Sequence, residues 1–166
     1  TQHASVLILS ANVDLKVLGL FSLALKISAV FAIPLIVVNS ITARKYARLY
    51  KEKKIKELRL LYLTSAKYLK YVASLGLFMF FLLGEQAIGL IGEAYVDSIE
   101  IITVLLVGQW ASLCVGSVIS ILVMTEFDKV HKRNTVFFSL LYILLLYLFI
   151  PVYGAIGAAI ITTIVV

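Results

Sequence analysis

The chain has 166 residues, of which 62% are hydrophobic and only 14% are charged, with a formal net charge of +6 and a mean hydropathy of +1.06. A soluble domain is nearer about 45–50% apolar and about 25% charged, so this composition excludes an ordinary soluble domain. It predicts an all-α, polytopic integral membrane helical bundle. The positive charge would suggest nucleic acid in a soluble protein, but here it gathers in loops between apolar runs. We therefore expect a bilayer, and no nucleic acid, as the partner.

Apolar sequence reaches both ends of the chain. Residues 4–10 resemble the last turns of a helix, and residues 154–166 resemble the first turns of another. Neither is long enough to cross a bilayer, which takes about 20 residues. We therefore expect residues 1–166 to be a single transmembrane lobe, a fragment of a longer protein, with about four full and two partial transmembrane helices.

The first full span is predicted over residues 17–41, VLGLFSLALKISAVFAIPLIVVNSI. Lys26 lies ten residues into it, where a cation costs about 2.5–3.5 kcal/mol on insertion scales. Either Lys26 faces a bundle interior or watery cavity, or it snorkels to the interface. Pro34 follows, and proline inside a spanning helix is expected to kink it.

A basic segment over residues 43–65 follows the first span. Between residues 44 and 59, two acidic residues accompany eight basic ones: Arg44, Lys45, Arg48, Lys51, Lys53, Lys54, Lys56 and Arg59. The positive-inside rule makes this segment cytoplasmic. Apolar residues between the charges predict a partly helical connector that lies along the membrane interface.

The next helix is predicted over residues 66–83, and residues 84–100 form a glycine-broken, acidic segment without a basic residue, expected on the external side. Residues 101–125 carry no charge and predict one further span. Small residues recur on it every fourth position and predict close packing against another helix: Gly108, Ser112, Gly116 and Ser120.

The remaining sequence repeats the pattern of basic loop and apolar span. Residues 129–133 form a second basic loop, again expected in the cytoplasm, and residues 135–150 a further span. Pro151 and Gly154 then predict an external turn before the last helix. His131 is expected to be a solvated loop residue, because no cluster of cysteine and histidine predicts a metal site.

Motifs that would carry enzymatic chemistry are not found in the sequence. It contains no GxxxxGK[ST] phosphate loop, no HExxH, no CxxC and no GxSxG. We therefore expect the chain not to be an enzyme and to need neither metal nor cofactor.

Three phrases of the sequence carry a resemblance to a known family: VLGLFSLALKISAVFAIPLIVVNSI followed by ARKYARLYKE, then IGLIGEAYVDSIEIITVLLVGQWASLCVGSVISILVMTE, and finally PVYGAIGAAIITT. In order and spacing they resemble the multidrug/oligosaccharidyl-lipid/polysaccharide exporter superfamily across nearly the whole chain. The similarity is greatest to its oligosaccharide flippase branch, the polysaccharide biosynthesis proteins.

The resemblance implies the second six-helix lobe of a fold similar to that of the multidrug exporters, with an N-terminal lobe of the same protein as its partner. It further implies a multi-pass transporter of the bacterial inner membrane. Such a protein flips a polyprenyl-diphosphate-linked oligosaccharide, such as an O-antigen repeat, by alternating access. Substrate-binding residues carried over from the family are Lys26, Asn39 and Gln109. The alternatives are a drug/cation antiporter of the same superfamily, and a non-transporting membrane subunit or lipid-modifying enzyme of polysaccharide assembly.

Overall fold

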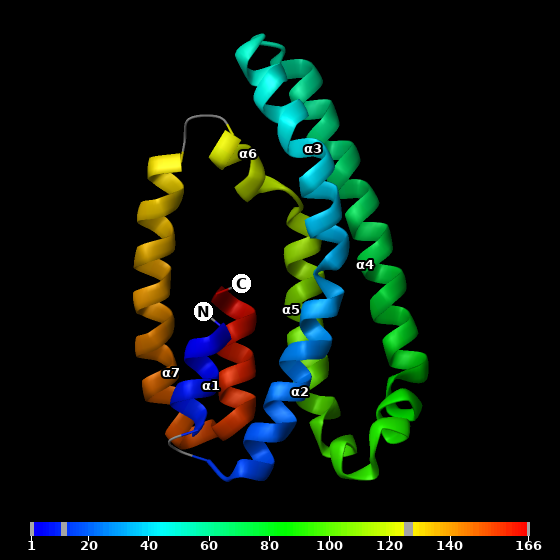
Figure 1. Ribbon diagram of the computed structural model, residues 1–166, viewed down its shortest axis with the longest axis vertical. Helices are drawn as coiled ribbons and strands as arrows, with labels where there is room; N and C mark the ends of the chain where they lie inside the picture. The colour runs from blue at the N-terminus through cyan, green and yellow to red at the C-terminus, as the bar shows by residue number, and fades with distance from the viewer. Residues whose placement is uncertain (1, 11–12, 125–127, 166) are drawn as a thin grey trace.

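The computed structural model describes residues 2–10, 13–124 and 128–165, and every element within them is a helix (Figure 1). In chain order the elements are α1 (Gln2–Ser10), α2 (Leu15–Phe31), α3 (Ile33–Lys51), α4 (Ile55–Ile91), the 3₁₀-helix η1 (Glu93–Ser98), α5 (Ile99–Val115), α6 (Val118–Met124) and α7 (Asp128–Val165). Apolar runs fold this way because a backbone in lipid must satisfy its own hydrogen bonds. The predicted all-α bundle is confirmed.

Four stretches of the described residues are long and apolar enough to cross a membrane: Leu15–Lys51, Ile55–Ile91, Tyr95–Val115 and His131–Pro151. Tyr153–Val165 and α1 are apolar helices of shorter length. The predicted count of four full spans is therefore confirmed for the described residues. Large apolar side chains, among them Leu75, Phe78 and Leu148, are exposed on the outside of the bundle, as a lipid-facing surface requires.

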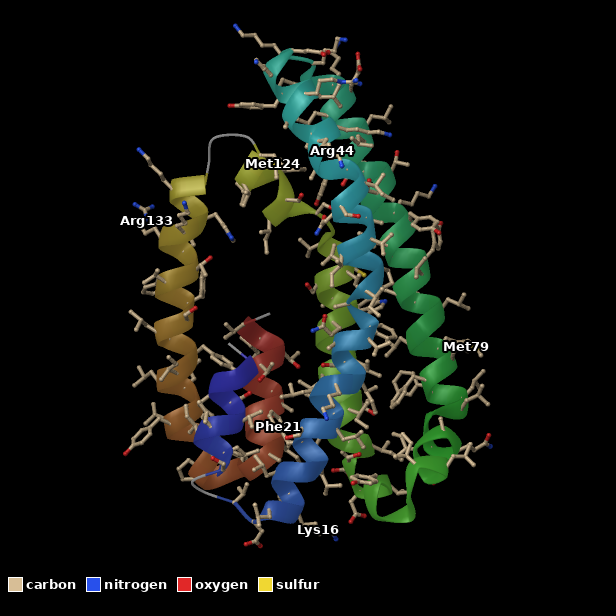
Figure 2. The ribbon with its side chains drawn as sticks, viewed as in Figure 1. Lys16, Phe21, Arg44, Met79, Met124 and Arg133 are labelled. Atoms are coloured by element: carbon tan, nitrogen blue, oxygen red, sulfur yellow. The ribbon has the colours of Figure 1, made fainter. Side chains whose placement is uncertain are left out.

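The helix α5 occupies the centre of the bundle and packs against α2, α4 and α7 (Figure 1). The main apolar core forms where these helices meet, and it includes Phe21, Ile102, Leu106 and Leu146, all fully buried or nearly so. Phe21 marks its position in the half of the bundle near the start of α2 (Figure 2).

The first span bends where the proline predicts it. The helix α2 ends at Phe31, Ala32 forms the turn, and Pro34 lies in the first turn of α3. Proline has no N–H and its ring clashes with the carbonyl four residues earlier, so the regular hydrogen-bond ladder stops there. The predicted kink is confirmed.

The predicted single span over residues 101–125 is wrong, because the helix breaks in its middle. The helix α5 ends at Val115, and Gly116 has φ 75° and ψ −146°, a conformation open almost only to glycine. The chain resumes as α6 at Val118; position 125 lies outside the described residues. Composition gave no sign of the break, since neither proline nor charge accompanies it.

The small residues of this stretch approach two different helices rather than one. A Cβ atom on Gly108 would lie 2.7 Å from Thr163 Cγ2 of α7. One on Gly116 would lie 3.1 Å from Ala66 Cβ of α4. Close packing is thus found at both glycines, but the break at Gly116 prevents one continuous stripe.

The second long helix extends further than predicted. Residues 66–83 were expected to end before a glycine-broken segment, but α4 continues through Gly84 and Gly89. The chain leaves the helix only at Gly92, with φ 157°, and then forms η1. Gly84 and Ile88 are buried on one face of this end of α4, and that packing outweighs the modest cost of about 1 kcal/mol for a glycine inside a helix.

The basic segment over residues 43–65 is the end of a helical hairpin rather than a connector along the interface. The helices α3 and α4 continue through it and project together at one end of the bundle (Figure 1). The turn is closed by backbone hydrogen bonds from Lys53 N–H to Tyr50 O, 3.0 Å, and from Lys54 N–H to Leu49 O, 2.9 Å. Lys53 takes a positive φ of 58° to make this turn.

The last helix, α7, is two antiparallel arms joined at Gly154, where φ is 56° and ψ is −136° (Figure 1). The hydroxyls of Tyr142 and Thr162 lie 3.0 Å apart and join the arms. The turn predicted at Pro151–Gly154 is therefore found, with the break in the backbone at the glycine.

Charge is divided between the two ends of the bundle. Arg44 of α3 and Arg133 of α7 lie at the same end, and Lys16 lies at the other (Figure 2). The basic loop predicted over residues 129–133 is wrong, because α7 already begins at Asp128, and His131 is a half-buried residue of that helix. Lys16 Nζ is 3.5 Å from Asp97 Oδ2, so the acidic η1 lies at the Lys16 end. The two basic segments therefore share one end of the bundle, and the acidic segment lies at the other.

Candidate functional site

Lys26 lies inside α2 on a face that no other described helix covers. Its side chain is exposed and forms no ion pair with the described residues. Val30 and Ile33, one and two turns further on, are 64% and 49% exposed. A cation is therefore set in an apolar, uncovered surface at membrane depth.

The opposite face of α2 holds the helix in the bundle. Phe21, Ala24, Leu25 and Ser28 recur at the spacing of one helical face, and all four are buried. The Ser28 hydroxyl donates to the Leu25 carbonyl, 3.0 Å, so this polar group needs no other partner. The position of Lys26 follows from this pattern, because it falls between the buried positions and points away from α5.

Asn39 lies in a pocket of about 400 Å³ between α3, α5, α6 and α7. The carboxamide Oδ1 of Asn39 and the hydroxyl of Ser117 are buried and have no hydrogen-bond partner among the described residues. Ser117 is only 1% exposed. Buried polar atoms are nearly always paired, so two in one pocket mark a place where a polar group is accommodated.

The break after α5 builds this pocket. Gly116 and Ser117 lie between two helices, so their backbone leaves the regular ladder and brings a hydroxyl to the pocket wall. Ser112 and Thr163 line the same space. Among the residues that the structure describes, none that lines it is charged. Sequence reasoning did not find Ser117; a Gly-Ser pair inside an uncharged apolar span is the one signal that could have done so.

The three residues predicted to bind substrate, Lys26, Asn39 and Gln109, do not share one surface. Lys26 is on the uncovered face of α2, whereas Asn39 lines the pocket behind α3. Gln109 is half-buried on α5, next to Gly108, but does not line the pocket. Lys26 therefore stands alone as a charged candidate, and roles for Asn39 and Gln109 in binding remain predictions.

These helices and their lipid-exposed surface define a polytopic, all-α membrane protein. Compared with protein-family models, curated proteins and solved structures, the chain finds no match.

Proposed function

We infer that this chain is a lobe of a bacterial inner-membrane transporter that flips a polyprenyl-diphosphate-linked oligosaccharide by alternating access. Lys26 carries the inference. It is a cation at membrane depth, on an uncovered face, with no carboxylate paired to it among the described residues. Such residues usually face a cavity or a substrate pathway, since exposure to hydrocarbon is costly.

An anionic substrate suits this cation. A diphosphate brought to Lys26 would be bound by charge-assisted hydrogen bonds, which gain strength where water is scarce. The polyprenyl tail would remain in lipid beside the apolar face that Val30 and Ile33 form. A second lobe facing Lys26 would enclose the cavity for the glycan.

A drug/cation antiporter is supported less well by the same residues. Coupling to a cation or proton needs an acidic side chain within the membrane, and the span Leu15–Lys51 contains none. The described residues that line the pocket of Asn39 and Ser117 are likewise uncharged. These observations favour an anionic substrate.

The decisive experiment is a flipping assay with the whole protein in proteoliposomes. A labelled polyprenyl-diphosphate oligosaccharide is loaded, and its exposure to an impermeant glycosidase is followed in time. Lys26→Ala should lower the flipping rate at least about tenfold, because one charge-assisted hydrogen bond is worth about 1.5–3 kcal/mol. Lys26→Arg should retain part of the rate, and Lys26→Glu should be the slowest.

Lys70→Ala is the matched control, since Lys70 is also an exposed lysine in a spanning helix. It should flip the substrate at the wild-type rate. Equal rates for wild type and Lys26→Ala, at equal amounts of folded protein, would mean that Lys26 only snorkels and would refute the proposal.

A further inference from the structure

A serine lies one helical turn before Lys26 on the same side of α2. Ser22 precedes Lys26 by four residues, and residues at this spacing are neighbours on a helix surface, with Cβ atoms about 5–6 Å apart. The buried face of α2 is formed by other positions, among them Phe21 and Leu25. Ser22 is half-buried, between that face and the uncovered one. Its hydroxyl is therefore a neighbour of the Lys26 side chain.

The hydroxyl of Ser22 differs from the other serine and threonine hydroxyls of the span Leu15–Lys51. Ser28 and Ser40 each donate to the backbone carbonyl three residues earlier, at 3.0 and 2.8 Å. Thr42 donates to the carbonyl four residues earlier, at 2.8 Å. Ser22 forms no hydrogen bond with the described residues. A hydroxyl that remains unpaired in an apolar environment is unfavourable, so Ser22 has a hydrogen bond to offer to a ligand.

The surface around Ser22 and Lys26 is open to a ligand. Long side chains on a helix point back over the preceding turn, so the ammonium group of Lys26 is expected to lie over the turn that carries Ser22. Gly19, three residues before Ser22, has no side chain, and no described atom lies within 4 Å of the position of a Cβ there. One ligand can therefore reach the ammonium and the hydroxyl together.

We propose that Ser22 is a second phosphate-binding residue, whose hydroxyl donates to the phosphate group that Lys26 holds. This inference rests on the proposed function, because it takes the diphosphate of the lipid-linked substrate as the ligand. A lysine binds phosphate as a point charge on a flexible stem, so it attracts the group without fixing its orientation. The directed hydrogen bond from Ser22 supplies that orientation.

Native mass spectrometry of the purified whole protein in detergent tests the proposal, with undecaprenyl diphosphate as the probe. Ser22→Ala should weaken binding about tenfold, the loss expected for one hydrogen bond to a charged group. In a Lys26→Ala background the same substitution should change binding less than about twofold, since the phosphate is no longer held beside Ser22. Undecaprenol, which has the same tail without phosphate, should bind equally to all variants.

Ser40→Ala is the matched control, because it removes an exposed hydroxyl of the same span that already donates to a backbone carbonyl. It should bind undecaprenyl diphosphate as wild type does. Unchanged binding in Ser22→Ala, together with weaker binding in Lys26→Ala, would overturn the role of Ser22 and leave the proposed function standing. Unchanged binding in Lys26→Ala would overturn the proposed function itself.

Two further outcomes separate this site from its alternatives. An equal loss from Ser22→Ala in the wild-type and Lys26→Ala backgrounds would show that Ser22 acts apart from Lys26, and would overturn the shared site. Dioleoyl phosphatidylglycerol, added as a competitor, should not displace undecaprenyl diphosphate. Full displacement at equal concentration would show that any lipid phosphate fits, and would overturn the diphosphate as the ligand.

Discussion

The hydroxyl of Tyr62 on α4 donates a 2.7 Å hydrogen bond to the carbonyl of Val115, the last residue of α5. The final carbonyls of a helix have no partner within it, so this bond satisfies one of them and fastens the end of α5 to α4. It lies directly beside the break at Gly116, and it spans 53 residues of sequence.

Tyr62→Phe removes this hydroxyl and keeps the aromatic ring, so it should destabilise the protein by about 0.5–1.5 kcal/mol. Thermal unfolding of the purified protein in detergent measures the effect. Tyr68→Phe is the control, because Tyr68 lies on the same helix and its side chain is exposed. A midpoint for Tyr62→Phe no lower than that of Tyr68→Phe would contradict the expected contribution.

The backbone conformation at position 116 and the close approach of Ala66 both favour glycine there. Gly116→Ala should cost about 1–3 kcal/mol, the usual penalty of a sparsely populated φ/ψ region, and Gly116→Leu should prevent folding. Gly19→Ala is the matched control: it lies within α2, and nothing is within 4 Å of the added Cβ. Denaturant titration should rank Gly19→Ala at or above wild type and Gly116→Ala below it. Similar stability of both alanine variants would contradict the strain at Gly116.

The turn of the hairpin carries an ion pair between Glu52 and Lys54, and the contribution of this pair to stability depends on pH. A hydrogen bond from Lys54, followed by the charge of that lysine, lowers the pKa of Glu52. The same hydrogen bond and the charge of Glu52 raise the pKa of Lys54. The Glu52 contribution is present above its unfolded pKa and is lost as pH falls through the folded pKa. The Lys54 contribution is present below its unfolded pKa and is lost as pH rises through the folded pKa.

NMR titration of isotope-labelled glutamate checks this ion pair. In Lys54→Gln the pKa of Glu52 should return toward its ordinary range, whereas Lys45→Gln should leave it unchanged, since Lys45 is not among the groups that shift it. A wild-type pKa of Glu52 within its ordinary range would contradict this ion pair.

The orientation of the bundle is tested by accessibility. With Cys114→Ala as background, Lys53→Cys should react with an impermeant maleimide only after cells are permeabilised, because basic loops face the cytoplasm. Glu100→Cys, at the acidic end, should react in intact cells. Labelling with the opposite preference would invert the membrane topology.

Much of the fold follows from patterns that the bilayer imposes. The apolar runs, the proline at position 34 and the turn before Gly154 are local signals, and each corresponds to a helix or a break in the structure. The charges of the loops likewise predict which loops share an end. These features depend on hydrogen bonding and solvation along one segment, so sequence alone suffices for them.

Other features depend on contacts between segments. At the break, Gly116 packs against Ala66 of α4, and Tyr62 of α4 donates a hydrogen bond to Val115. The sequence of residues 101–125 alone predicts neither contact. The continuation of α4 through Gly84 depends on packing with its neighbours. In the candidate site, the place of Lys26 follows from helical periodicity, whereas the presence of Asn39 and Ser117 in one pocket arises only from the way α3, α5, α6 and α7 come together.

The short helix α6 is attached to the bundle separately from α5. None of its residues is fully buried, and Gly116, with its unusual torsions, lies between it and the central α5. The helix α6 contacts α3 and α7, whereas α5 also packs against α2 and α4. The wall that Val118 and Ile119 give to the Asn39 pocket is therefore positioned by other neighbours than the wall that α5 gives it.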